Sequence, residues 1–127
     1  MKLVLDTNTV VSGLFWRNAP RLLLDAAAEG RVELATSTVL IEELAEVIAR
    51  AKFSHKLAEQ HVTARVLLNR YAGLARRVTP ASIRRTVIDD ADDDHVLACA
   101  LAAQADLIVS GDAHLRKTGI PFTNVTS

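Results

Sequence analysis

The apolar residues of the chain fall into short uninterrupted runs, separated by longer stretches with helical periodicity. The run Leu3 to Leu5 has no polar alternation, and Leu107 to Val109 repeats this pattern late in the chain. Such runs are typical of strands that are buried on both faces of a sheet. The predicted strands cover residues 2–5, 32–35, 107–109 and 122–125, with a weaker candidate at 86–88.

Helices are predicted in the segments between these strands. Ser12-Gly13 interrupts the first such segment, and Pro20 then suits the first turn of a helix that runs to about Glu29 and stops at Gly30. Ser37 can cap the next helix. One face of that helix carries Leu40, Leu44, Val47, Ile48 and Ala51. The remaining predicted helices cover residues 55–76, before Pro80, and residues 93–104, which are apolar almost all round and therefore buried.

Strands that alternate with helices predict an α/β fold with a parallel central sheet and right-handed crossovers. The chain has 127 residues, half of them apolar, and no repeat or linker divides it, so we expect one domain over residues 1–127. Cys99 is the only cysteine, which excludes a disulfide within the chain. No segment approaches the ~18 apolar residues of a membrane span, and the N-terminus has no signal-peptide pattern. We therefore expect a cytoplasmic protein with no membrane partner.

The net charge is zero, but the charges are sorted along the chain. Between residues 50 and 85 nine basic residues face one acid, Glu59. These basic residues are Arg50, Lys52, Lys56, Arg65, Arg70, Arg76, Arg77, Arg84 and Arg85. Five aspartates crowd residues 89–94. This sorting fits an acidic spot beside a basic surface, while an ordinary solvated helical face explains the basic segment equally well.

Two aspartates follow predicted strands directly. Asp6 ends the first strand, and Asp112 comes shortly after the strand at 107–109. Ligands of parallel sheets bind outside the carboxyl ends of the strands, and adjacent strands would bring the two carboxylates together there. Taken singly, Asp6 could close an Asx turn and Asp112 could cap a short helix.

The helix after the second strand offers three glutamates, of which helical geometry selects one. At about 100° per residue, Glu43 lies at the edge of the apolar stripe, whereas Glu42 and Glu46 point towards solvent. Glu43 is therefore the candidate that can face inward, although a partly exposed surface glutamate is an equally simple interpretation.

The segment DDADDDHVLACA supplies further carboxylates at the start of the buried helix. Aspartates are favoured at a helix N-terminus by about 0.3–1 kcal/mol each, but five in six residues exceed what capping needs. Asp94 has Leu97 and Leu101 on its side of the helix and is preferred. Asp93 aligns with Val96 and stays an alternative.

Carboxylates gathered at one sheet edge repel one another unless a cation joins them. Mg²⁺ prefers oxygen ligands and keeps several waters, so a few acids suffice. Zinc is disfavoured because the four histidines do not show Cys-His ligand spacing. These histidines are His55, His61, His95 and His114.

The motifs DTNTVVSGLF, STVLIEEL with Glu43, and DDADDDHVLACALAAQADLIVSGD, in this order and spacing, closely resemble the PIN-domain family. The chain is most similar to small bacterial and archaeal PIN proteins assigned as toxins of toxin–antitoxin pairs, of the VapC type. The resemblance extends from about Leu3 to about Leu115, nearly the whole chain. It implies a three-layer α/β/α fold with a central parallel sheet flanked by helices.

The resemblance also implies a site. The family has four acidic positions around Mg²⁺ or Mn²⁺, which match Asp6, Glu43, Asp94 and Asp112 here. Asn8 matches the small polar residue beside the first acid, and Ser110 matches the Thr or Ser before the fourth. The doublets Glu42-Glu43 and Asp93-Asp94 leave room for a shift of one residue, so Asp93 is kept as a candidate metal ligand.

The functional hypothesis is a metal-dependent endoribonuclease, the toxin of a type II toxin–antitoxin pair. The resemblance implies an RNA substrate, a separate antitoxin protein and a homodimer. A phosphatase with an aspartyl nucleophile would need a second Asp where Asn8 stands and an acid where Arg116 stands. A receiver domain would need an acidic pair at the end of the first strand and a late lysine directly after a strand, and neither appears at those places. The remaining alternative is a catalytically inactive RNA- or protein-binding module.

Overall fold

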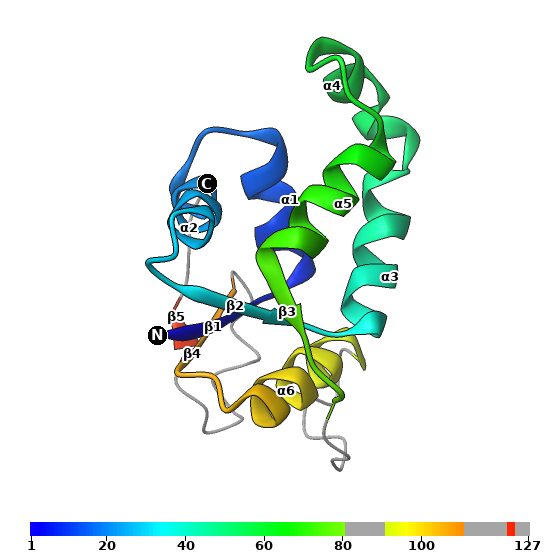
Figure 1. The fold of residues 1–127 in the computed structure, drawn as a ribbon. Helices are drawn as coiled ribbons and strands as arrows, with labels where there is room; N and C mark the ends of the chain where they lie inside the picture. Colours follow the sequence, from blue (N-terminus) through cyan, green and yellow to red (C-terminus); the bar gives the residue numbers. More distant parts are fainter. Residues whose placement is uncertain (81–90, 111–121, 124–127) are drawn as a thin grey trace.

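The computed structural model describes residues 1–80, 91–110 and 122–123, and for residues 91–93 and 122–123 the backbone alone. Its strands form one parallel sheet in the order β3-β2-β1-β4-β5, with β1 at the centre (Figure 1). Val4 of β1 lies opposite Ala35 of β2 and Ile108 of β4. The strands are β1 (Lys2–Leu5), β2 (Glu33–Thr36), β3 (Ala75–Arg77), β4 (Leu107–Val109) and β5 (Phe122–Thr123).

Helices cover both faces of this sheet, as Figure 1 shows: α1, α3 and α5 lie on one side and α6 on the other. The described helices are α1 (Thr7–Phe15), α2 (Ala19–Ala28), α3 (Thr38–Ile48), α4 (Ser54–Glu59), α5 (Ala64–Leu74), α6 (Ala91–Ala103) and the short 3₁₀ helix η1 (Ala51–Phe53). The predicted three-layer α/β/α fold with a parallel sheet is confirmed.

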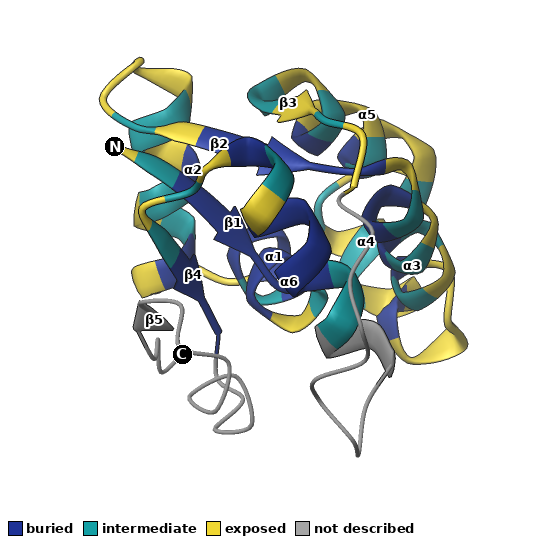
Figure 2. Ribbon diagram, turned by 90° about the horizontal axis from the view of Figure 1, so that it is seen from below, coloured by how far each residue is buried: buried dark blue, intermediate teal, exposed yellow. Residues whose placement is uncertain are grey.

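The alternation of side chains along β1 divides the core in two. Leu3 and Leu5 pack with the inner faces of α1, α3 and α5, whereas Val4 packs with Val96 and Cys99 of α6. Leu3, Val4 and Leu5 are all buried, and most of β1 and β4 is dark blue in Figure 2. The uninterrupted apolar run of the sequence is explained by this two-sided burial.

The predicted break at Ser12-Gly13 is wrong, because α1 runs through both residues. A Cβ at Gly13 would lie 3.0 Å from the carbonyl carbon of Pro20 and 3.0 Å from Cδ1 of Leu24. The glycine therefore serves the close approach of α1 and α2 rather than a turn. Arg21 of α2 reinforces this contact by donating to the carbonyl oxygens of Gly13 and Leu14, which the end of α1 leaves without helical partners.

The predicted signals for the next two helices are confirmed. Pro20 lies in the first turn of α2, and Gly30 follows its end with a φ of 77°. Ser37 caps α3 by accepting a hydrogen bond from the Leu40 amide over 3.3 Å. The helix ends at Ile48, so Ala51 does not continue its apolar face. The buried residues of α3 are Leu40, Ile41, Leu44 and Ile48.

The single helix predicted for residues 55–76 is wrong. The chain forms α4, reverses at His61 with a φ of 54°, and begins α5 after Thr63, whose side chain accepts a hydrogen bond from the Val66 amide. Residues 75–77 form the edge strand β3 instead of a last helical turn. The Arg76 and Arg77 side chains are exposed there, which masks the strand in the sequence pattern.

The late elements agree with the prediction where the structure describes them. α6 and β4 are present, and β5 pairs with β4 through Phe122 and Thr123. The strand candidate at 86–88 lies outside the described residues. Among the described helices, none is both long enough and apolar enough to cross a membrane.

Candidate functional site: an acidic edge of the sheet

Asp6 lies at the carboxyl end of the central strand and begins the site. It follows β1 directly and is the N-cap of α1, with an extended backbone at the point where the strand becomes a helix. Its amide donates to the carbonyl oxygen of Val109 over 3.2 Å, which continues the pairing of β1 and β4 by one residue. Asp6 is only 7% exposed. A carboxylate this buried needs partners, because the charged form is otherwise strongly destabilised.

Two donors hold the Asp6 carboxylate in place. The amide of Thr9 donates to Oδ1 over 2.8 Å, and the hydroxyl of Ser110 donates to Oδ2. Ser110 is fully buried and comes directly after β4. Because a carboxylate oxygen has two lone pairs, each oxygen keeps acceptor capacity beyond these bonds. The arrangement fixes the direction of a carboxylate that still can coordinate a cation.

Glu43 reaches the same edge of the sheet from α3. Its Oε2 accepts a hydrogen bond from the Thr7 hydroxyl over 3.3 Å, and Thr7 is the residue after Asp6. The Glu43 side chain is 18% exposed, against 77% for Glu46, and Glu42 is exposed. The predicted orientation of these three glutamates is confirmed.

The start of α6 lies beside Glu43. His95 Nε2 is 4.0 Å from Glu43 Oε1, and Asp94, the preceding residue, is half-buried. The predicted buried side of α6 below Asp94 is confirmed only in part, because Leu97 is buried whereas Leu101 is 45% exposed. Asp93 belongs to α6, but its side chain is outside the described part, so the preference between the two aspartates stays a prediction.

The other predicted residues are placed as follows. Asn8 lies in the first turn of α1 and is exposed. Asp112 lies outside the described residues. The structure thus brings Asp6 together with Ser110 directly, and with Glu43 through Thr7.

The donor set of this edge fits a hard divalent cation. Asp6, Glu43 and Asp94 offer carboxylate oxygens, the ligands that Mg²⁺ and Mn²⁺ prefer. Cys99 of α6 is fully buried, and burial raises the pKa of its thiol to about 11, which keeps it protonated at neutral pH and unsuited to metal binding. Within the described part, no three His, Cys, Asp or Glu side chains are grouped as a complete metal site.

Three residues of this region were missed by the sequence interpretation: Thr7, Thr9 and His95. Thr7 and Thr9 flank Asn8 in the motif DTNT, so their closeness to Asp6 was visible, but their partners come from α3 and β4. The Thr9 hydroxyl donates to the Val109 carbonyl oxygen over 3.4 Å. Contacts between distant segments carry no local signal.

Tyr71 is a further buried polar residue behind this edge. Burial raises the pKa of its hydroxyl above the ordinary value. Asp6 and the ionised form of Cys99 raise this pKa further, whereas a hydrogen bond with Thr36 lowers it. The phenol therefore stays protonated, and its hydroxyl adds no negative charge beside Asp6.

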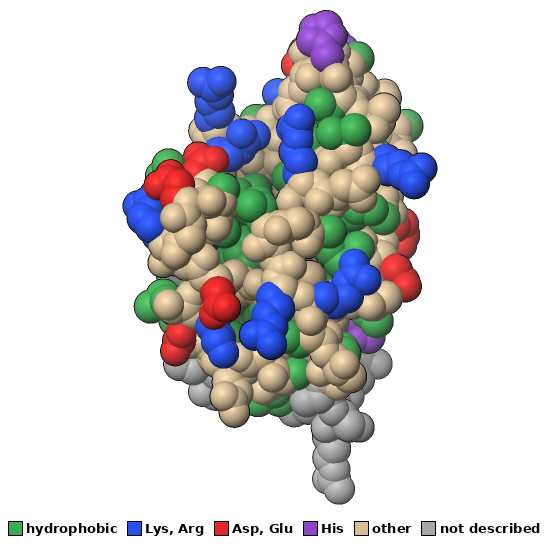
Figure 3. All heavy atoms as spheres, in the orientation of Figure 1, with side chains coloured by type: hydrophobic (Ala, Val, Ile, Leu, Met, Phe, Trp, Pro, Cys, Tyr) green, Lys and Arg blue, Asp and Glu red, His purple; other side chains and the backbone are tan. Residues whose placement is uncertain are grey.

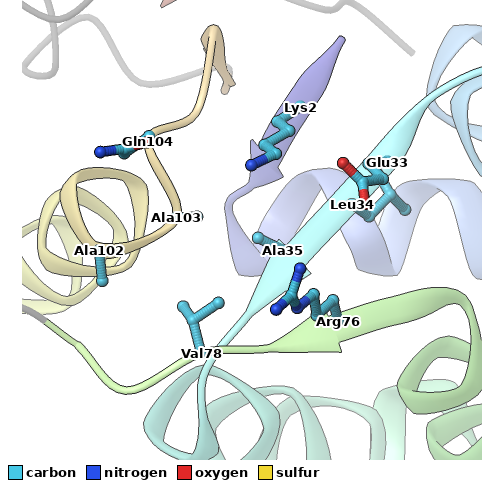
Figure 4. Close-up of a pocket in the computed structure, with 9 residues that line it drawn as sticks. All are labelled: Lys2, Glu33, Leu34, Ala35, Arg76, Val78, Ala102, Ala103 and Gln104. Carbon is cyan, nitrogen blue, oxygen red and sulfur yellow. The ribbon is translucent and has the colours of Figure 1, made fainter.

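A separate cavity of about 160 Å³ lies on the α6 side of the sheet (Figure 4). It is lined by Lys2 and Glu33 at the starts of β1 and β2, by Arg76, and by Gln104 after α6. It is thus near the amino ends of the strands, whereas Asp6 follows a carboxyl end. Its mixed charges do not define a ligand, and it is not part of the acidic edge.

The fold and this edge together define a known class of protein. The chain belongs to the PIN domain family, which it matches over residues 2–114. No match was found among curated proteins.

Solved structures with the same fold agree with this assignment. A chain of VapBC2 from Rickettsia felis, bound to a DNA fragment from its promoter, superposes with a TM-score of 0.69 and 17% identity, over 99% of this chain and 100% of that one. A chain of FitAcB from Neisseria gonorrhoeae gives 0.59 and 18%, over 96% of each. A chain of FitAB bound to the IR36 DNA fragment gives 0.59 and 20%, over 96% and 94%. At these identities the likeness establishes the fold.

Proposed function

We propose that the protein is a metal-dependent endoribonuclease that acts as the toxin of a type II toxin–antitoxin pair. The observation that carries the proposal is the Asp6 carboxylate, buried at the end of the central strand, held on both oxygens and bridged through Thr7 to Glu43. Membership of the PIN domain family supports a nuclease.

Mg²⁺ or Mn²⁺ would be held by carboxylates of this edge. Asp6, Glu43 and Asp94 are the proposed ligands, completed by Asp112, with Asp93 as the alternative to Asp94. When bound, such a cation lowers the pKa of a coordinated water and neutralises charge on a phosphodiester.

The chain's own residues have distinct tasks in this proposal. Asp6 fixes the position of the site relative to the sheet, because its two oxygens are already oriented by Thr9 and Ser110. Thr7 holds Glu43. Ser110 and Thr7 are positioning residues: they touch the carboxylates and set their direction, in the way that outer-shell partners orient metal ligands.

Exposed basic residues offer a surface for the RNA backbone. Figure 3 shows Lys and Arg side chains over α5, β3 and the connection between α1 and α2, while acidic side chains gather around α2 and on the outer side of α3. Phosphate contacts by such residues provide affinity that does not depend on sequence. A protein with zero net charge needs this separation to bring RNA near an acidic site.

One of the proposed partners is supported by the fold neighbours. The VapBC2 and FitAcB structures support a separate antitoxin protein as partner, and we propose a cytoplasmic homodimer in which residues 1–127 act as one PIN unit.

The test is cleavage of RNA by the purified protein. We expect endonucleolytic products in Mg²⁺ or Mn²⁺, none in EDTA, and none from Asp6→Asn. Circular dichroism would verify that the variant is folded. Activity that survives both EDTA and the substitution overturns the proposal. Metal binding without cleavage of any RNA would favour an inactive binding module.

A further inference from the structure

A hollow of about 570 Å³ runs along the exposed side of α1, next to the acidic edge. Its lining begins at Asn8 and Ser12 on α1 and ends at Trp16, Arg17, Lys52 and Phe53. Asn8 is two residues from Asp6 along the chain. At a rise of 1.5 Å per helical residue, Trp16 lies roughly 12 Å further along α1. The hollow therefore leads away from the proposed metal ligands.

An aromatic cluster forms the far end of this hollow. Phe15 and Phe53 stack with ring centroids 4.7 Å apart and planes 4° from parallel. Trp16 meets them edge-on, at 5.9 Å and 6.5 Å. The two phenylalanines are buried, whereas Trp16 is 43% exposed. The Trp16 indole thus packs against the buried rings of Phe15 and Phe53, while much of its surface faces solvent.

Cations surround the exposed indole. Lys56 Nζ lies over the Trp16 ring at 5.3 Å from its centroid, and Lys52 Nζ lies over Phe53 at 5.2 Å. Arg17 lines the same hollow and is exposed. None of the described residues that line it is Asp or Glu. The surface therefore combines an aromatic platform with positive charge, the two features of sites that bind single-stranded nucleic acid.

We infer that this hollow binds the single-stranded RNA that flanks the scissile phosphate. A base stacks on Trp16 in place of the Lys56 ammonium, which moves to a neighbouring phosphate, and further phosphates contact Lys52 and Arg17. The inference rests on the proposed function, since it assumes that the acidic edge acts on RNA. An acidic peptide could pair its carboxylates with the lysines and the arginine, but it has no flat base to stack on the exposed indole. RNA is therefore the favoured occupant.

Trp16 is the only tryptophan in the chain, so its fluorescence reports binding at this hollow alone. EDTA allows this binding to be measured without cleavage. Oligouridine of ten nucleotides, added to the protein of residues 1–127 in EDTA, is expected to quench the tryptophan fluorescence. The logarithm of the binding constant should fall with the logarithm of salt concentration by about 0.7 for each phosphate contact. Lys52→Ala should reduce this slope by about 0.7.

Variants separate stacking from charge. Trp16→Ala should weaken binding of end-labelled oligouridine, followed by anisotropy, about tenfold to a hundredfold. Trp16→Phe should restore part of the affinity, which a merely misfolded variant would not. Arg31→Ala is the matched control for Lys52→Ala, because Arg31 is exposed between α2 and β2 and pairs with Glu29. It should leave both affinity and salt slope unchanged.

The outcomes distinguish the subsite from the nuclease. RNA cleavage by a protein whose Trp16 fluorescence does not change and whose Trp16→Ala variant binds normally overturns the subsite and leaves the nuclease intact. Quenching with the expected salt slope, but no cleavage in Mg²⁺ or Mn²⁺, supports the subsite and overturns the nuclease. Quenching by a glutamate-rich peptide and not by oligouridine assigns the hollow to a protein partner and overturns the inference.

Discussion

The hydroxyl of Ser110 donates a hydrogen bond to the carboxylate of Asp6, although 104 positions separate the two residues. The bond exists because β1 and β4 are adjacent and parallel, so that their carboxyl ends meet. Both residues are buried. The sheet thereby couples the orientation of the proposed first metal ligand to a residue from the opposite end of the chain.

Ser110→Ala should therefore damage the site and the fold together. Removing one donor from a buried carboxylate costs roughly 1–3 kcal/mol of unfolding free energy. Loss of a positioning contact to a metal ligand lowers affinity or activity by about 10–100-fold. Urea unfolding and RNA cleavage would measure the two effects. Ser110→Thr keeps the hydroxyl and should retain most activity; if it lost as much as Ser110→Ala, the hydrogen bond would not be the cause.

Added metal should stabilise the protein through the same carboxylates. A ligand at one hundred times its dissociation constant adds about 2.7 kcal/mol to the free energy of unfolding, which for a chain of this size raises Tm on the order of 10 °C. Thermal unfolding with and without Mn²⁺ measures the shift, and EDTA should reverse it. In Asp6→Asn the shift should largely disappear. A shift of equal size in that variant would place the metal elsewhere.

Glu43 and Glu42 form a matched pair for testing the second acid. Both belong to α3. The Glu43 side chain is mostly buried and accepts a hydrogen bond from the Thr7 hydroxyl, whereas Glu42 is exposed. Glu43→Gln should reduce cleavage by at least the 10–100-fold that outer-shell partners cost. Glu42→Gln should stay within about twofold, since exposed substitutions away from such features change little. The reverse ranking in a cleavage assay would mean that the site uses the other member of the doublet.

Local patterns predicted the parts of the fold that burial dictates. The apolar run Leu3 to Leu5 predicts β1 because both faces of this strand are covered. Ser37 predicts the start of α3 because its side chain caps the helix. Residues 75 and 76 are predicted as the end of a helix, because the two exposed arginines of the edge strand at 75–77 leave no apolar alternation. The sequence predicts a break at Ser12-Gly13, because nothing local shows that α2 packs against Gly13.

The site residues, like the fold, could be predicted only where a local sequence pattern indicates them. Helical geometry alone separated Glu43 from its exposed neighbours, because the apolar stripe of α3 fixes which side faces the protein. Thr7 and His95 could not be found in this way, since both meet Glu43 only after α1, α3 and α6 have packed. The same holds for the choice between Asp93 and Asp94, which depends on the position of α6 rather than on its sequence.

Gly13 and Gly73 should respond to alanine with opposite signs. Alanine within a helix normally gains up to about 1 kcal/mol over glycine. At Gly13 the new Cβ meets the backbone of Pro20 at 3.0 Å, and overpacking of this kind costs typically 1–3 kcal/mol. At Gly73, on α5, nothing lies within 4 Å. Urea unfolding should show a lower midpoint for Gly13→Ala and a higher one for Gly73→Ala. A higher midpoint for both would mean that α1 and α2 can separate at no cost.

Cys99 should make stability fall at alkaline pH. The thiol is fully buried, and burial raises its pKa to about 11 from an unfolded value of 9.0. The native state therefore keeps a proton that the unfolded chain releases, so this contribution is complete below pH ~9 and is lost as the pH rises towards 11. By pH ~10.5 the loss should be about 2 kcal/mol.

The comparison with Cys99→Ala isolates this effect, because Tyr71, whose pKa is also raised by burial, stays protonated in the folded state of both proteins over this pH range. Removing the thiol costs stability at neutral pH through lost packing. The difference between the two unfolding free energies should shrink between pH ~8 and ~10.5, measured by urea unfolding in reducing buffer. Parallel pH profiles would contradict the prediction, since they would show that Cys99 loses its proton as readily in the folded protein as in the unfolded chain.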